Sequence, residues 1–256
     1  MQSHYDWQYL QNQFANALIN SYRRTNLFGK DHVSKLANVL TDADIALLHQ
    51  RTHPIYESYQ QHYTTWQKAV SFYKGETARM TELLNVLRSQ KAAQWDIKIQ
   101  IVYMAGTPEY MTLLPNGRTG IYDGGRDLQM QNLRTLAEAL AEYPDLAALK
   151  AEVANFVLII DEARHRQQKR EQAVQNHATE LRKAQQALFT ILYRNLGRLM
   201  DKYAHETNYI TNYFQLEIIR NISNGNDDIE TEVKEIKPET TNEKTDKGDT
   251  NEKTTA

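Results

Sequence analysis

The sequence contains no cysteine and only five prolines and ten glycines in 256 residues. The lack of cysteine excludes disulfides, thiolate metal sites and a cysteine nucleophile. Few prolines and glycines mean few turns, and therefore long secondary-structure elements. The segment Met1–Trp7 lacks the basic and then apolar pattern of a signal peptide. The longest apolar run, Phe156–Ile160, is far shorter than a membrane span. We therefore expect a cytoplasmic protein that does not enter a membrane.

The net charge of −2 hides an uneven distribution along the chain. Residues 224–256 hold ten acidic and five basic side chains, a balance of −5, which leaves +3 on residues 1–223. Because a charge of +3 is too small for a nucleic-acid footprint, we expect no nucleic-acid partner. Residues 224–256 are rich in Thr, Glu, Lys and Asp and repeat Thr-Asn-Glu-Lys-Thr. This composition cannot bury a core, so it predicts a disordered acidic tail.

Two long helical segments dominate the rest of the chain. Residues 145–222 contain no proline and one glycine, Gly197, and their apolar residues recur every three or four positions. This pattern predicts one long second helix. Residues 41–105 form the first arm, which Thr41 caps and whose apolar stripe includes Ile97, Ile101 and Met104. Pro54 and Gly75 are expected to weaken or kink that arm.

The segments outside the arms are shorter and hold more turn signals. Residues 106–144 carry half of all glycines and predict a compact head, with a tight turn at Leu114–Gly117, a small hairpin around it and a helix over 128–142. Residues 6–40 predict two helices separated at Gly29.

Together these segments predict an all-α, elongated, antiparallel coiled-coil hairpin with a small Gly/Pro-containing head and a disordered C-terminal tail. We divide the chain into a helical domain over 1–223 and the tail over 224–256.

The glycine-rich part of the head is a candidate anion site. Gly124 and Gly125 precede the predicted head helix, and Arg118 and Arg126 supply positive charge nearby. Backbone amides at a helix N-terminus together with arginines are suited to bind phosphate or carboxylate. The spacing fits neither a P-loop nor a dinucleotide-binding fingerprint. A structural turn cluster is the alternative interpretation.

Two sets of residues have metal-ligand spacing. His49, His53 and Glu57 recur every four residues on one helix face, and Glu162 precedes His165 by three. Pro54 disturbs the first set, and the second lacks the further carboxylates and the second Glu-x-x-His that a di-iron site needs. A surface histidine stripe and a solvated helix with Glu162–Arg166 pairing are the preferred interpretations. We therefore assign no metal, no cofactor and no catalytic residue.

Two stretches carry a resemblance. They run from Trp95 through Thr107-Pro108-Glu109-Tyr110 to Arg118, and from Leu192 to Met200. They resemble bacterial helical proteins of unknown function in which such a loop joins two long helices. The resemblance covers roughly residues 40–220 and implies the hairpin architecture and a bacterial source, but no activity.

The predicted architecture favours a non-enzymatic protein that works in protein–protein interaction or scaffolding, through a protein partner or self-association of its helices. The alternative is a head loop that acts as a binding module or enzyme for an anionic small molecule.

Overall fold

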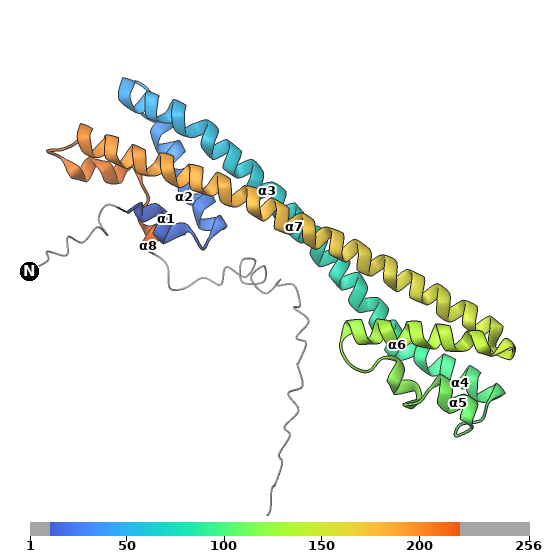
Figure 1. The fold of residues 1–256 in the computed structure, drawn as a ribbon. Helices are drawn as coiled ribbons and strands as arrows, with labels where there is room; N and C mark the ends of the chain where they lie inside the picture. The colour runs from blue at the N-terminus through green and yellow to red at the C-terminus, as the bar shows by residue number, and fades with distance from the viewer. Residues whose placement is uncertain (1–10, 221–256) are drawn as a thin grey trace, which may run out of the picture. The chain divides into compact units, whose positions relative to one another are not determined.

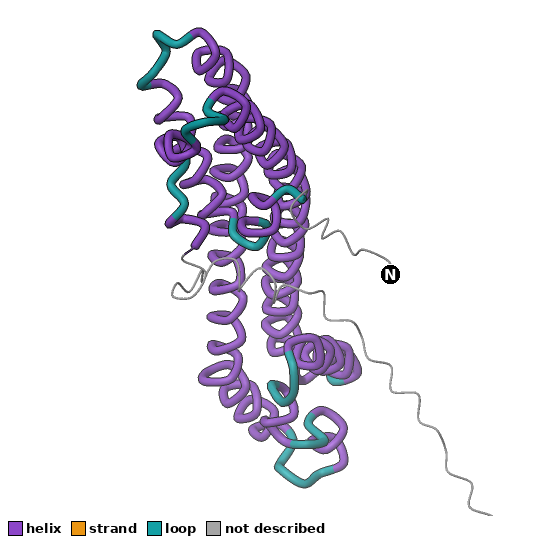
Figure 2. Tube along the Cα trace, turned by 90° about the vertical axis from the view of Figure 1, so that its left-hand side faces the viewer, coloured by secondary structure: helices purple, strands orange, loops and turns teal. Residues whose placement is uncertain are grey.

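The computed structural model describes residues 11–220. Within this range the chain is helical and contains no strand (Figures 1 and 2). The elements are α1 (Gln13–Leu18), α2 (Tyr22–Ala37), α3 (Ala43–Val86), the π-helical turn η2 (Leu87–Lys91), α4 (Ala92–Val102), α5 (Pro108–Leu113), the 3₁₀ turn η3 (Gly117–Ile121), α6 (Arg126–Ala139), the 3₁₀ turns η4 (Leu140–Glu142) and η5 (Pro144–Leu146), α7 (Ala147–Lys202), the 3₁₀ segment η6 (Thr207–Tyr213) and α8 (Glu217–Arg220). The all-α prediction is confirmed.

The two long helices, α3 and α7, pack against each other in opposite directions. Gln167 on α7 donates to Thr77 on α3 over 3.0 Å, and Lys91, just beyond α3, donates to Glu152 over 2.9 Å. From the first of these contacts to the second, the residue number increases on the α3 side and decreases on the α7 side. The two helices are therefore antiparallel. The predicted hairpin is confirmed, and its supercoiling stays a prediction.

The chain forms two compact units. Among the described residues, the first combines 11–53 with 188–220, and the second holds Pro54–Ala187. Both long helices contribute to both units.

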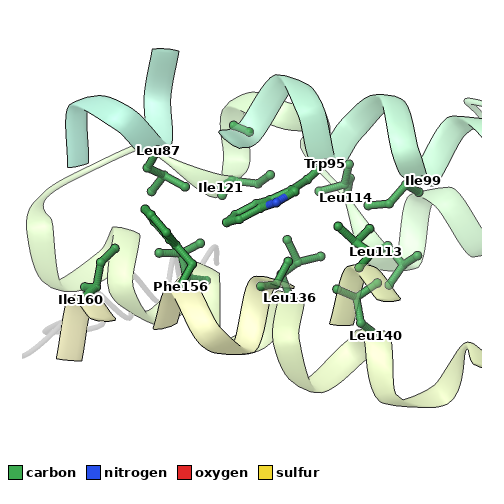
Figure 3. Close-up of a cluster of buried hydrophobic side chains, with 14 of the residues drawn as sticks. Leu87, Trp95, Ile99, Leu113, Leu114, Ile121, Leu136, Leu140, Phe156 and Ile160 are labelled. Carbon is green, nitrogen blue, oxygen red and sulfur yellow. The ribbon is translucent and has the colours of Figure 1, made fainter. Parts of the chain in front are cut away.

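The second unit has a large apolar core built around α4, α6 and the start of α7. Trp95 is fully buried at its centre, and its indole meets the Phe156 ring edge-on at 5.6 Å between centroids. Figure 3 shows Trp95 among side chains from several helices and from the turn η3. The other labelled members are Leu87, Ile99, Leu113, Leu114, Ile121, Leu136, Leu140 and Ile160.

Short elements replace the hairpin that the sequence predicts in the head. Thr107 caps α5 by accepting from the Tyr110 amide at 3.3 Å, and Pro108 begins the helix, where its missing N–H costs nothing. Gly117 is the last residue of the predicted Leu114–Gly117 turn. Its φ of +62° is the left-handed conformation that glycine adopts without steric cost. The predicted turn is therefore confirmed. The predicted flanking strands are wrong, because the segments on either side of the turn form α5 and η3 and make their backbone hydrogen bonds within these short helices.

The first unit begins with α1 and α2. Asn12 caps α1, and Ser21 caps α2 by accepting from the Arg24 amide. The expected break at Gly29 is wrong, because this residue lies buried inside α2. The start of the predicted first helix, before residue 11, lies outside the described residues.

An aromatic stack and a chain of buried hydrogen bonds join α2 to the other parts of the first unit. The His32 imidazole stacks on the Phe214 ring, with 4.3 Å between centroids and 5° between planes. Its Nδ1 donates to the Tyr213 carbonyl at 2.8 Å, and its Nε2 accepts from the Asn195 amide at 2.9 Å. The same Asn195 amide donates to Thr52 Oγ1 at 2.7 Å, and Thr52 donates to the Leu48 carbonyl. Four elements are thus joined through one neutral imidazole.

The long helices differ from their predicted bounds. α3 continues through Pro54 and Gly75. Pro54 is exposed, as is Gln50 one turn earlier, so the carbonyl that loses its helical partner can meet water. α7 ends at Lys202, whereas the pattern predicts helix to 222. Thr and Asn residues, which are weak helix formers, are frequent after that point, and η6 and α8 take its place. The predicted disordered tail over 224–256 lies outside the described residues.

Burial of His32 makes the stability of the protein depend on pH. Desolvation, and to a smaller extent the charge of Lys35, lower its pKa from 6.5 to about 4, against the opposing effect of the Tyr213 carbonyl. Because the folded pKa is depressed, its contribution to stability is complete above pH 6.5 and falls as pH drops to about 4. We expect a loss of about 3 kcal/mol in the free energy of unfolding over that window.

This expectation is checked by denaturant unfolding at several pH values. The exposed residue His205 provides the control, because His205→Gln should keep the pH dependence and His32→Gln should lose it. An NMR titration of the unaltered protein that puts the His32 imidazole near 6.5 would contradict the assignment.

Candidate functional site

One carboxylate holds α4 against α7 in the second unit. Glu152 accepts from Lys91 Nζ at 2.9 Å, from Trp95 Nε1 at 3.1 Å and from Lys98 Nζ. The three donors lie four and three residues apart, and therefore on one helix face. The hydrogen bonds from Lys91 and Lys98 lower the pKa of Glu152 to about 2. Because the inner face of α4 is bound in this way, its opposite face is turned outward.

That outward face carries isoleucines. Ala92, Trp95 and Ile99 are buried, and the residues on the opposite side of the helix are Ala93, Gln94, Ile97, Gln100 and Ile101, which we call the α4 face. Ile97 is 59% exposed and Ile101 is 78% exposed. Met104, in the loop that follows α4, is 76% exposed. Large apolar side chains exposed next to one another are typical of interaction surfaces.

The charged residues beside the α4 face have partners within the same unit. Lys98 binds Glu152. Asp96 Oδ1 accepts from the Tyr110 hydroxyl at 2.8 Å and from Gln100 Nε2 at 2.9 Å. Burial and this carboxylate raise the pKa of Tyr110. The α4 face itself carries no charge.

The π-helical turn η2 explains why the isoleucines point outward. A π-helical turn contains one residue more than an α-helical one and rotates everything after it. In an uninterrupted α-helix Ile101 would lie roughly 40° from buried Leu87 around the axis, and the extra residue increases this angle to roughly 140°. The predicted inward stripe through Ile97, Ile101 and Met104 is therefore wrong, and Ala92, Trp95 and Ile99 occupy the inward positions instead.

A crevice of about 310 Å³ lies in the head between the segment 112–123 and α6. Asn132 Nδ2 donates to the Gly120 carbonyl at 2.7 Å and so fixes one wall. Asp123 is the only ionisable side chain among the lining residues, which otherwise include apolar groups, amides and hydroxyls. The crevice therefore suits a small amphipathic molecule.

The predicted anion-binding residues lie close to this crevice in sequence but do not line it. Arg118 is on η3, Gly125 caps α6 and Arg126 begins α6, and both arginines are exposed. Gly124 has φ of +80°, and its carbonyl accepts from Gln129 Nε2 at 2.8 Å. The glycine thus has the conformation that a tight turn requires. The anion site stays a prediction.

The predicted metal ligands are separated or paired with other groups. His49 and His53 stack with 5.2 Å between ring centroids, and Glu57 is exposed one turn further along α3. Glu162 accepts from Arg166 at 2.6 Å, which confirms the predicted pairing, and His165 is exposed. Among residues 11–220, no three His, Asp or Glu side chains gather closely enough to hold a metal ion.

Basic residues of the middle of α7 pair with acids and one aromatic ring. Arg164 approaches Asp127 at 3.4 Å, and the Arg170 guanidinium lies 4.9 Å from the centre of the Phe72 ring. Arg134 on α6 donates to Asp161 at 2.6 Å beside the exposed His165, along a cavity of about 420 Å³. Intramolecular pairing accounts for this charged stretch.

Sequence reasoning missed both Glu152 and the α4 face. The spacing of Lys91, Trp95 and Lys98 is visible in the sequence, but their common acceptor lies more than fifty residues away. In the part of the chain that the structure describes, no helix is both long enough and apolar enough to cross a membrane.

The Glu152 cluster leads to a prediction about stability. We expect Glu152→Gln to lower the free energy of unfolding by about 1 kcal/mol, because a neutral amide loses two charged hydrogen bonds that solvent partly screens. The carboxylate has a depressed pKa, so the difference between the two proteins should be complete above pH 4.5 and shrink as pH falls towards 2. Denaturant titration measures it. The matched control is Glu138→Gln on the exposed side of α6, which should leave stability unchanged.

Comparisons with protein-family models, with curated proteins and with solved structures find no match for this chain.

Proposed function

We propose that this chain acts in protein–protein interaction or scaffolding, and that the α4 face is its contact surface. The observation that carries the proposal is the outward exposure of Ile97 and Ile101 on a helix whose other face is fixed in the core. Fully burying an aliphatic side chain of this size contributes about 1.5–3 kcal/mol. Two isoleucines and the neighbouring Met104 therefore supply a useful part of a binding free energy, once the cost of association is subtracted.

The arrangement of the second unit supports this role, because the face is rigid before a partner arrives. Trp95 is fully buried, and Glu152 accepts from Trp95 and Lys98 of α4 and from Lys91, the residue just before α4. A preorganised helix loses little conformational entropy on binding, and this raises affinity for a given contact area. The antiparallel pair of α3 and α7 gives the unit a continuous helical support.

We place this activity in the cytoplasm and without nucleic acid. The sequence contains no cysteine, so its fold needs no oxidising compartment. The pairing of the α7 arginines with acids supports a protein partner over a polyanion.

The proposal is tested by comparing what three tagged proteins capture from cells of the native host. The unaltered chain should retain a set of proteins that Ile101→Glu loses, because an apolar contact cannot accommodate a buried carboxylate. The matched control is Leu158→Glu on α7, which adds the same charge at a residue that is 67% exposed. Equal capture by all three proteins would contradict a role for the α4 face.

The head is a second candidate site, for a small molecule. The crevice of about 310 Å³ has the size of a ligand pocket, and the exposed Arg118 and Arg126 are next to it in sequence. An anion would use the arginines and the backbone at Gly125, whereas an uncharged ligand would use the crevice alone.

Thermal-shift measurements separate these ligands. Inorganic phosphate at a hundred times its Kd should stabilise the protein by about 2.7 kcal/mol, which raises the melting temperature by roughly 5–10 °C. Arg126→Ala should abolish that shift, and Arg79→Ala, which removes an exposed arginine from α3, should leave it intact. A phosphate shift that survives Arg126→Ala would refute the anion site.

A further inference from the structure

We propose that the α4 face is a self-association site, at which α4 of one chain pairs with α4 of a second copy. The inference rests on the proposed interaction function and names the partner of the same face. It follows from three properties of the face: its charge, its hydrogen-bonding groups and its symmetry.

The charge of the face permits pairing with itself. In a two-fold interface each residue meets itself or its near neighbours, so a charged face would repel its copy. The α4 face carries only Ala, Gln and Ile side chains, and its charged neighbours Asp96 and Lys98 are bound within their own unit. A partner with a charged surface would instead have to desolvate that charge without an opposite charge to receive it.

The polar groups of the face are complementary to themselves. Gln94 and Gln100 flank the isoleucines and are exposed. An amide side chain both donates and accepts, so the two Gln100 side chains, which lie close to the expected two-fold axis, can satisfy each other. Gln100 uses one donor on Asp96, and its oxygen remains an acceptor for the other chain.

The spacing of the apolar residues fits an antiparallel arrangement. Ile97 and Ile101 lie one turn apart, and a two-fold axis midway between them places Ile97 of each copy against Ile101 of the other. Met104, beyond the end of α4, then meets the beginning of the opposite helix. The same two isoleucines of each copy thus pack against the two isoleucines of the other.

The size of the face predicts a weak dimer. An 11-residue helix is roughly 16 Å long, so one helix face offers less than the roughly 800 Å² per partner of a standard interface. Interfaces of this size belong to transient associations, and we expect a Kd on the order of 10–100 μM. The purified chain should therefore be a monomer when dilute and a dimer when concentrated.

Sedimentation velocity of the full chain over a series from low micromolar to near-millimolar concentration tests the inference. The mean mass should rise towards that of a dimer. Ile101→Glu should weaken association at least tenfold, because two carboxylates would be buried against each other, and Leu158→Glu should behave like the unaltered chain. A monomer at every concentration, or equal loss of association in both variants, would overturn the inference.

The absence of native cysteine allows a second test that retains both isoleucines. Gln100→Cys introduces one thiol close to the expected two-fold axis, and mild oxidation should give a disulfide-linked dimer. Glu138→Cys on α6 is the control and should cross-link much less. Equal cross-linking of the two variants would count against pairing through α4.

The two proposals fail in different ways. If the purified chain stays monomeric but capture from cells still depends on Ile101, self-association is refuted and the interaction function stands. If capture is also unaffected by Ile101→Glu, both proposals are refuted.

Discussion

The orientation of α4 depends on one carboxylate that receives three donors from the same helix face. Glu152 binds two lysines and the Trp95 indole at the edge of the apolar core, so burial of the indole and placement of the charges occur together. The close-packed Trp95 indole and its hydrogen bond to Glu152 together fix the rotation of α4 about its axis, and the two lysines add charge-assisted hydrogen bonds. The exposure of the opposite face follows from this constraint together with the extra residue of the π-helical turn η2.

The two units achieve a defined structure by different means. The second unit has a continuous apolar core around Trp95, and its polar anchor lies at the periphery. In the first unit a chain of buried polar groups runs through the interior from Thr52 to Tyr213. Each member of that chain has a partner, so burial is tolerated, but the protonated imidazole would place two donors, His32 Nε2 and the Asn195 amide, against each other. Specificity in this unit therefore requires a neutral histidine.

The sequence was sufficient to predict the class and the pairing of the long helices, because periodicity over fifty or more residues is a strong signal. It also located the turn at Gly117. It failed where local preference and tertiary packing disagree. Gly29 lies within a helix because the site is buried, and Pro54 is tolerated because its lost hydrogen bond faces water. The end of α7 was predicted twenty residues too late, since Tyr and Ile beyond Lys202 continue the apolar spacing but pack from a 3₁₀ segment instead. The α4 face was out of reach, because helical periodicity presupposes an unbroken α-helical repeat.

The π-helical turn Leu87–Lys91 has a consequence for how such a surface can arise. Rewinding of the turn as an α-helix with every residue retained would carry Ile101 to roughly 40° from Leu87 and turn the indole of Trp95 away from the core. Loss of a single codon within the turn would instead restore the ordinary repeat and leave α4 in its present orientation, with the isoleucines outward. A buried seam and an exposed contact surface are thus separated by the winding of one helical turn, without any change in the amino acids that form them.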